Sequence, residues 1–459
     1  MERLISGTLD RLGLAVRPSH RNRVIDQISG FAKTLLGAVG AQASTYLVMV
    51  LMTRLLGVER FGQFGAIQAT LTAAFGLSTL GIGVTATRYI AQYRQTDPMR
   101  TGRIIGLCNL SSLASGLFFT LILFAFAGMI ARHIFHSEDL RWAIQVTSIC
   151  SLLMTVNANQ IGTLMGFQAF GRQLRAQVLQ SIASVIMTYL LVGAYGFDGA
   201  VLSFSLSTLI GCLLLNLEIG RELKIRKLKV NYREAWAEQK ILFNFALPAA
   251  ASGVIGSAAV WMAQIMLVRS EAGMAEMGLW TAAASMRAVV LLGPSVLSRV
   301  SSPILSALHD HGRGDDYGKT MWSTAMASTA GALAVGLLVL LFGPWLLTHF
   351  GKDYARAAGL FPLVIGSAVV EAYACSISQA LVAHRRLSYQ LFIISLWGST
   401  LMVIAWWGID RYASSGLAGA YLTAWVSTAA GYTWIARRLI AARGVGMISD
   451  REGLEVIRA

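Results

Sequence analysis

Apolar stretches of roughly 20 residues recur along the chain, and they constrain its fold more than any other feature. A helix of that length crosses the hydrocarbon core of a bilayer, which is about 30 Å thick. In lipid such a stretch has to be helical, because a helix satisfies its own backbone hydrogen bonds. The sequence therefore predicts an all-α integral membrane protein.

The composition leads to the same class. Of 459 residues, 55% are hydrophobic and only 13% are charged, whereas soluble domains average about 25% charged residues. The four cysteines lie inside separate apolar stretches, at positions 108, 150, 212 and 375. This placement indicates small core side chains rather than disulfides or metal ligands. We predict no cofactor and no metal site.

The polar connections between the apolar stretches define about twelve predicted transmembrane helices. In the first half of the chain the predicted helices cover residues 31–53, 61–87, 104–131, 140–167, 174–195 and 198–220. In the second half they cover residues 241–268, 278–307, 321–348, 357–382, 388–409 and 416–437.

Basic residues divide unevenly between the two sets of connections. The N-terminus, every second connection and the C-terminus hold about 28 Lys and Arg, against about eight on the other side. Because basic segments stay in the cytoplasm, both termini are predicted to be cytoplasmic. The asymmetry also explains the net charge of +15 without a nucleic-acid partner.

The longest polar connection, residues 221–240, follows the sixth predicted helix and divides the chain into two halves. The predicted organisation is a basic cytoplasmic interfacial segment (1–30), an N-terminal six-helix lobe (31–220), a basic linker (221–240), a C-terminal six-helix lobe (241–437) and a cytoplasmic tail (438–459). The first of these segments is expected either to lie on the inner leaflet or to form a basic tail.

The two halves share short matches in the same order. The runs 57–62 and 273–278 both begin and end with glycine and lie 216 residues apart. A second match pairs Arg172, Leu174 and Gln177 with Arg385, Leu387 and Gln390. A third pairs Gly199 and Gly211 with Gly419 and Gly431. Because each half has six helices, equivalent helices are parallel and related by an axis along the membrane normal. Two parallel lobes around a cavity favour a transporter that works by alternating access.

Several of these segments resemble a known family. They are the runs 53–64, 81–83, 88–91, 245–248, 303–306, 350–354 and 416–420. The chain resembles the polysaccharide-biosynthesis (Wzx-like) flippases of the multidrug/oligosaccharidyl-lipid/polysaccharide exporter superfamily. The resemblance implies two six-helix bundles in a V shape around a central cavity. It also implies a bacterial cytoplasmic membrane and a polyprenyl-diphosphate-linked oligosaccharide as substrate, flipped from the cytoplasmic to the outer leaflet.

Three arginines are candidates for holding a diphosphate, which the guanidinium fork suits well. Arg287 lies well inside a predicted helix, where a charge is costly and marks either a functional site or an ion pair with another helix. Arg54 and Arg88 close the first two predicted helices, so they are either substrate ligands or interfacial anchors.

Glu371 is the one carboxylate near the middle of a predicted helix. It could bind a coupling H⁺ or Na⁺, or it could be the partner of Arg287. Asn157 and Gln160 could bind sugar hydroxyls from one helix face, or form hydrogen bonds between helices.

Three other functions compete with the flippase. An ion-coupled drug or metabolite antiporter of the same superfamily needs acidic residues for organic cations, whereas the buried charge here leans basic. A polysaccharide polymerase or ligase usually has a large outer loop, and the predicted outer connections are short. Residues 221–240 could also recruit other polysaccharide-assembly proteins. The remaining expected partners are membrane lipids, and the chain is expected to be no enzyme.

Overall fold

The computed structural model describes residues 18–241, 247–271, 273–310, 314–383 and 387–456. Within these residues, side chains are described for 37–241, 253–271, 273–295, 297, 317–343, 345–378 and 391–438. All regular structure in this part of the chain is helical, as predicted. Of the predicted interfacial segment, residues 1–17 lie outside the described part, and α2 begins at Pro18.

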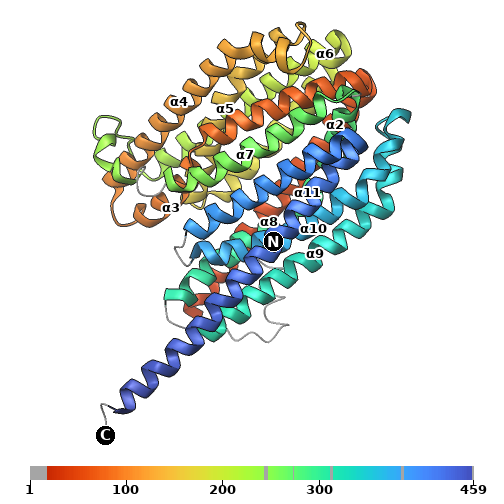
Figure 1. Ribbon diagram of the computed structural model, residues 1–459. Coiled ribbons are helices and arrows are strands. Elements are labelled where there is room, and N and C mark those ends of the chain that lie inside the picture. Colours follow the sequence, from red (N-terminus) through yellow and green to blue (C-terminus); the bar gives the residue numbers. More distant parts are fainter. Residues whose placement is uncertain (1–17, 242–246, 272, 311–313, 384–386, 457–459) are drawn as a thin grey trace. The chain divides into compact units, whose positions relative to one another are not determined.

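The main helices run in sequence order (Figure 1). They are α2 (Pro18–Ser78), α3 (Ile82–Tyr93), α4 (Pro98–Met129), α5 (Leu140–Gly166), α6 (Phe170–Ile225), α7 (Leu247–Val268), α8 (Gly273–Asp310), α9 (Gly314–Thr348), α10 (Phe361–Ala383) and α11 (Leu387–Val456). A π-helix covers Ile130–Ile134, and 3-10 helices cover Ala235–Glu238 and Lys352–Leu360.

Among the described residues, seven helices are long and apolar enough to cross a membrane. Three of these apolar segments are 42, 56 and 48 residues long, in α2, α6 and α11. A single crossing needs about 20 residues. Each of the three is interrupted by one non-helical residue, namely Gly57, Gly196 and Ala413. Each therefore has the length and the break needed for two crossings.

The prediction of one continuous helix over residues 61–87 was wrong. The structure ends α2 at Ser78 and starts α3 at Ile82. Between them Leu80 and Gly81 have φ values of 43° and 66°, which a right-handed helix cannot contain. The break is local backbone geometry, and the apolar pattern runs through it unchanged.

The chain forms two compact units, and the first contains residues 1–55 and 74–250. In this unit α3, α4, α5 and α6 lie side by side (Figure 1). Their core includes fully buried aliphatic side chains such as Ile90, Ile104 and Ile105, with Phe167 at the end of α5. The thiol of Cys108 is buried in the same core as a small side chain, as predicted.

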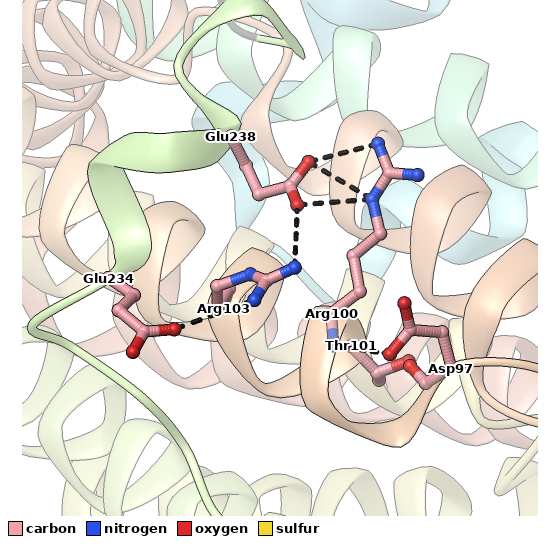
Figure 2. A network of polar contacts seen from close by, with 6 residues as sticks. All are labelled: Asp97, Arg100, Thr101, Arg103, Glu234 and Glu238. Atoms are coloured by element: carbon pink, nitrogen blue, oxygen red, sulfur yellow. Dashed lines mark hydrogen bonds and ion pairs between the residues drawn. The ribbon is translucent and has the colours of Figure 1, made fainter.

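The predicted linker packs onto the first turns of α4. Glu238 accepts hydrogen bonds from Nε and Nη2 of Arg100, at 3.0–3.1 Å, and pairs with Arg103 at 3.5 Å (Figure 2). The backbone N–H of Asn231 donates to the carbonyl of Gly102 at 3.2 Å. A Cβ at Gly102 would lie 2.3 Å from the Lys229 carbonyl oxygen, so glycine is needed for this approach.

We expect Glu238→Ala to destabilise the protein by about 1–3 kcal/mol, because a nearly buried carboxylate bonded to two arginines is lost. The Glu238 side chain is 9% exposed, whereas that of Glu234 is 57% exposed and contacts Arg103 at 3.4 Å. The matched variant Glu234→Ala should cost less than about 1 kcal/mol. Thermal unfolding of the detergent-solubilised variants compares the two. Equal losses would contradict the assignment of Glu238 as the main contact.

The second unit contains residues 56–73 and 251–459. Here α8, α9, α10 and α11 lie side by side (Figure 1). The segment Leu56–Ala73 of α2 belongs to this unit and packs with these helices, although the sequence placed it in the N-terminal lobe. Its glycines explain the contact, because a Cβ at Gly65 would lie 2.4 Å from Oγ1 of Thr281. The division into two six-helix lobes stays a prediction.

The first pair of repeated runs, 57–62 and 273–278, forms a reciprocal contact inside the second unit. A Cβ at Gly62 would lie 1.7 Å from the carbonyl oxygen of Met274, and a Cβ at Gly278 would lie 2.3 Å from that of Val58. Residues 58 and 62 are equivalent to 274 and 278 at the shift of 216 found in the sequence. Each copy therefore contacts the other through the same two positions, as two-fold related surfaces do.

A second equivalence appears at the breaks of α6 and α11. Gly196 has φ 57° and ψ −126°, and Ala413, 217 residues later, has φ 48° and ψ −123°. After each break a glycine approaches the preceding helix, with a Cβ at Gly199 reaching 1.9 Å from Leu191 O and one at Gly416 reaching 2.1 Å from Gly408 O. The structural equivalent of Gly199 is therefore Gly416, and its predicted match with Gly419 was wrong.

The predicted match of Gly211 with Gly431 agrees with the contacts. A Cβ at Gly211 would meet the side chain of Gln180, and one at Gly431 would meet that of Ile393. From the contact residue to the break, the α11 copy (Ile393 to Ala413) is four residues longer than the α6 copy (Gln180 to Gly196). From the break to the contact glycine, it is three residues longer. Each difference is about one helical turn, which keeps every side chain on its original face.

A methyl group at Gly62 should separate the two repeated runs. We expect Gly62→Ala to destabilise the protein by about 1–3 kcal/mol, as overpacking does. Gly40 lies in the same helix α2 with nothing within 4 Å of its Cβ position, so Gly40→Ala should be neutral or slightly stabilising. Thermal unfolding midpoints test the pair. An unchanged midpoint for Gly62→Ala would show that the contact is not tight.

Candidate functional site

The second unit contains a cavity of about 610 Å³. Its walls come from α2, α7, α8, α10 and α11. The lining combines aromatic side chains, small residues, and uncharged polar groups such as Gln68, Thr72 and Gln264. None of the described lining residues is charged. The volume lies within the range of about 300–1,000 Å³ that is usual for small-molecule sites.

Helical spacing explains how the lining forms. On α8 the lining residues are Met277, Trp280, Thr281 and Ala284, a spacing that puts all four on one face of the helix. Small residues also line the cavity, among them Gly256 of α7. The large lining side chains therefore come mainly from α8 and α11, and the small ones mainly from α2 and α7.

An aromatic cluster forms one side of the cavity. The ring centroids of Trp280 and Tyr421 are 5.0 Å apart, and those of Trp397 and Trp425 are 5.4 Å apart. Trp397 also meets the edge of Tyr421 at 6.2 Å. These separations are typical of favourable aromatic pairs. The cluster joins α8 to α11 and gives this wall a defined shape.

The indole N–H groups of this cluster are unusual. Nε1 of Trp280, Trp397 and Trp425 is buried and has no acceptor within the described part of the chain. Trp261 of α7 differs, because its Nε1 donates to Oγ1 of Thr70 at 3.1 Å. A buried donor without a partner loses its hydration and gains nothing in return. All three residues line the cavity, but the nitrogen atoms themselves are buried in the packing of the cluster.

Arg287 and Glu371 form an ion pair beside the cavity. Nη2 of Arg287 donates to Oε2 of Glu371, and the guanidinium lies over the Tyr421 ring at 5.5 Å. The side chains are 21% and 16% exposed. Each of the three residues lies one helical turn from a lining residue: Ala284, Cys375 and Trp425 respectively. The pairing that the sequence left open is therefore present, and its charges neutralise each other.

The other predicted site residues belong to the first unit. Arg54 and Arg88 are exposed on α2 and α3, and the Arg88 guanidinium lies 5.7 Å from the ring centroid of Tyr89. Asn157 and Gln160 lie on α5 with their side-chain carbonyl oxygens buried and unpaired in the described residues. Binding of substrate by these four residues stays a prediction.

The sequence missed a neighbour on α5. Asn159 is 1% exposed, and its Nδ2 donates to Oδ1 of Asn109 on α4 at 2.8 Å. Nδ2 of Asn109 in turn donates to the hydroxyl of Tyr232 at 3.3 Å. The amides of α5 therefore include one that links helices, the structural alternative that the sequence left open for this polar stripe.

The aromatic cluster was also missed. Aromatic side chains at the ends of membrane helices are common interfacial anchors, so their presence alone predicts little. Tyr421 and Trp425 are four residues apart and inside a predicted helix, which was the available signal. Only the packing of α8 against α11 brings Trp280 to them.

Breaking the ion pair should be costly. We expect Arg287→Ala to destabilise the protein by about 3–5 kcal/mol, because Glu371 is left without its partner. The double variant Arg287→Met/Glu371→Leu should recover most of this loss, because no charge remains unpaired. Thermal unfolding measures both.

The exposed pair of Arg132 and Glu138 provides the control, since its side chains are 57% and 72% exposed. Arg132→Ala should cost no more than about 1 kcal/mol. A double variant as unstable as Arg287→Ala would contradict the view that the two charges depend mainly on each other.

Comparisons with known sequences cover most of the chain. The model of a family described as "Polysaccharide biosynthesis protein" matches residues 29–309. The lipid III flippase of Escherichia coli (strain K12) is 22% identical over 389 residues, which cover 83% of this chain and 91% of that protein. The lipid III flippase of Shigella flexneri matches to the same extent.

Solved structures show a shared fold. An inward-facing multidrug resistance MATE family transporter of the MOP superfamily has a TM-score of 0.72 at 16% identity, over 88% of this chain and 95% of its own. A MOP superfamily transporter from Pyrococcus furiosus, described as having a binding pocket of reverse polarity, has a TM-score of 0.68 at 16% identity. That match covers 92% of this chain and 96% of the transporter.

Proposed function

Because the chain belongs to the polysaccharide biosynthesis protein family, we propose that it flips a polyprenyl-diphosphate-linked oligosaccharide across a membrane. The lipid would move from the cytoplasmic to the outer leaflet of the bacterial cytoplasmic membrane and supply cell-surface polysaccharide synthesis. The observation that carries the proposal is the nearly full-length match to lipid III flippases. The chain is a multi-pass membrane protein with a transporter fold, rather than an enzyme.

The proposed architecture is twelve helices in two parallel six-helix lobes, V-shaped around a central cavity, with both termini in the cytoplasm. Three apolar helices long enough for two crossings support the number of helices. The reciprocal contact of Gly62 and Gly278, and the equivalent breaks at Gly196 and Ala413, support parallel repeats. Alternating access would then be a rocking of one lobe against the other.

The substrate has an anionic diphosphate, a polar sugar head and an apolar tail. We assign the diphosphate to Arg287, with Arg54 and Arg88 as further cationic ligands, because guanidinium groups bind phosphate oxygens through paired hydrogen bonds. Asn157 and Gln160 bring unpaired amide oxygens that suit sugar hydroxyls. In this scheme the diphosphate competes with Glu371 for Arg287.

Such competition would couple transport to an ion. When the diphosphate takes Arg287, Glu371 loses its counter-charge in a poorly hydrated place, and binding H⁺ or Na⁺ restores neutrality. Release of the ion on the other side would restore the pair of Arg287 and Glu371 and expel the diphosphate. The pair thus acts as a switch between the empty and the loaded transporter.

The second candidate is an ion-coupled drug or metabolite antiporter. The fold that the chain shares with multidrug transporters favours it, as does the aromatic wall of the cavity. The charges do not separate the two candidates, because the described cavity lining has neither a carboxylate nor a cation and Arg287 and Glu371 are paired with each other. An organic cation would find no free counter-charge there.

The test is flipping of a fluorescent polyprenyl-diphosphate saccharide in proteoliposomes. Arg287→Lys keeps the charge opposite Glu371 and removes the planar fork. We expect it to slow flipping at least about tenfold, the effect of losing one charged hydrogen bond of about 1.4 kcal/mol or more, with near-normal thermal stability. Arg132→Lys, at an exposed position, should flip at the normal rate.

The gradient dependence separates the candidates. Wild type should flip faster when H⁺ or Na⁺ is more concentrated on the side from which the lipid starts, because ion and lipid move in the same direction in this scheme, and Glu371→Gln should lose that response. If wild type leaves the lipid in place but exports tetraphenylphosphonium in exchange for H⁺ or Na⁺, the antiporter is the correct function and the flippase proposal is wrong.

A further inference from the structure

We propose that Arg175 and Arg221 bind the phosphate group of an anionic phospholipid of the cytoplasmic leaflet. The two arginines lie on the two arms of α6, before and after the break at Gly196, at the end that the charge distribution predicts to be cytoplasmic. A buried carboxylate, that of Glu218, holds them together. The inference goes beyond the proposed function and does not depend on which substrate the chain moves.

The first argument is the position of the two guanidinium groups. Nη1 of Arg221 donates to Oε1 of Glu218 at 2.7 Å, and Nη1 of Arg175 lies 3.6 Å from the same oxygen. The other oxygen of Glu218 accepts from Nη1 of Arg172 at 3.1 Å. The Glu218 side chain is only 5% exposed, so it is fixed by packing. Two cations that would otherwise repel each other are therefore held beside one buried anion.

The second argument is an excess of positive charge. Glu222 pairs with Nε of Arg172 at 2.6 Å and with Nε of Arg226 at 2.7 Å. The cluster thus contains four guanidinium groups and two carboxylates. Arg172 and Arg226 both contact Glu222, whereas Arg175 and Arg221 have only the carboxylate that they share. The uncompensated charge therefore lies mainly on these last two residues, where an anion would offset the repulsion.

The third argument is that the two guanidinium groups are accessible. The side chains of Arg175 and Arg221 are 62% and 58% exposed. Within the described residues Nη1 of each faces Glu218, and their other N–H groups have no acceptor there. Gly171, one turn before Arg175, has nothing within 4 Å of its Cβ position, so the surface beside the pair is open. Phosphate oxygens accept hydrogen bonds from such a fork of donors.

The fourth argument is the apolar surface that continues from the arginines along both arms. Its residues are four to eight positions from the nearer arginine, a spacing that puts them on the same helix face. They are Leu179 and Ile182 on the first arm, 47% and 53% exposed, and Leu213 and Leu217 on the second, 54% and 59% exposed. In a bilayer such a face is covered by acyl chains. An amphiphile with a phosphate at one end matches both parts of the surface, and anionic lipids are attracted to basic clusters at the cytoplasmic side.

The test is a lipid titration of the detergent-solubilised full-length protein, followed by native mass spectrometry. Dioleoylphosphatidylglycerol is compared with dioleoylphosphatidylcholine, and wild type should bind at least one phosphatidylglycerol more tightly than phosphatidylcholine. Arg175→Gln/Arg221→Gln should weaken this binding at least about tenfold, the effect of losing one charged hydrogen bond or more, and leave phosphatidylcholine binding unchanged. Arg175→Lys/Arg221→Lys keeps the charges without the planar forks and should give an intermediate affinity.

A matched variant controls for total charge. Arg233 and Lys240 are exposed residues of the linker, on the same predicted side of the membrane. Arg233→Gln/Lys240→Gln removes the same charge as the double glutamine variant of α6 and should change phosphatidylglycerol binding by less than about twofold, because exposed charges act weakly and without geometry. Glu218 retains its bond to Arg172 in the α6 variant, so this protein should unfold at a near-normal temperature in phosphatidylcholine.

Three results would overturn the inference. Equal losses in the two glutamine variants would show that phosphatidylglycerol responds to the total charge of the surface rather than to the arginine pair. Displacement of the lipid by millimolar inorganic phosphate would make the pair a site for a free anion. Tighter binding of farnesyl diphosphate than of phosphatidylglycerol, lost in the α6 variant, would assign the pair to an isoprenoid diphosphate. None of these results alters the flipping assay with Arg287→Lys, so the two proposals fail separately.

Discussion

Lipid offers no hydrogen bonds, and most of this structure follows from that constraint. Backbone groups are satisfied within helices, and hydroxyls such as those of Thr147 and Ser376 donate to carbonyls of their own helix. Charge inside a span is paired, as Arg287 and Glu371 are. Under this rule an unpaired polar group is an exception that needs an explanation. The three indole donors of the aromatic cluster are such exceptions, and so are the side-chain carbonyl oxygens of Asn157 and Gln160.

Close helix contact is the other consequence of a lipid environment. Helices in a bilayer gain little from excluding lipid, so they associate through tight packing at small residues. Gly62 and Gly278 illustrate this, because each lies against the backbone of the other repeat copy. Equivalent glycines make the contact in both copies, so the two halves of the contact have the same geometry. The breaks in α6 and α11 are a second feature that both copies share, because Gly196 and Ala413 have similar backbone angles.

The cavity and the ion pair are neighbouring features of different polarity. The described cavity walls carry no charge, and the pair of Arg287 and Glu371 lies one helical turn away. Tyr421 connects them, since it contacts Trp280 on one side and lies under the guanidinium on the other. A movement of the ion pair would therefore displace Tyr421 and, through it, the aromatic wall of the cavity.

The sequence by itself determined the membrane class, the helical character of the chain and the presence of a charge inside a helix, because the length and composition of an apolar stretch are local properties. It also left two roles open for Glu371, binding of a coupling ion or pairing with Arg287. Only the tertiary structure decided that the two pair, that α2 breaks after Ser78, and that Leu56–Ala73 packs with the second unit. It alone assembled the aromatic cluster, since Trp280 and Trp397 are more than 100 residues apart. Contacts of this kind depend on how helices pack, which no local pattern records.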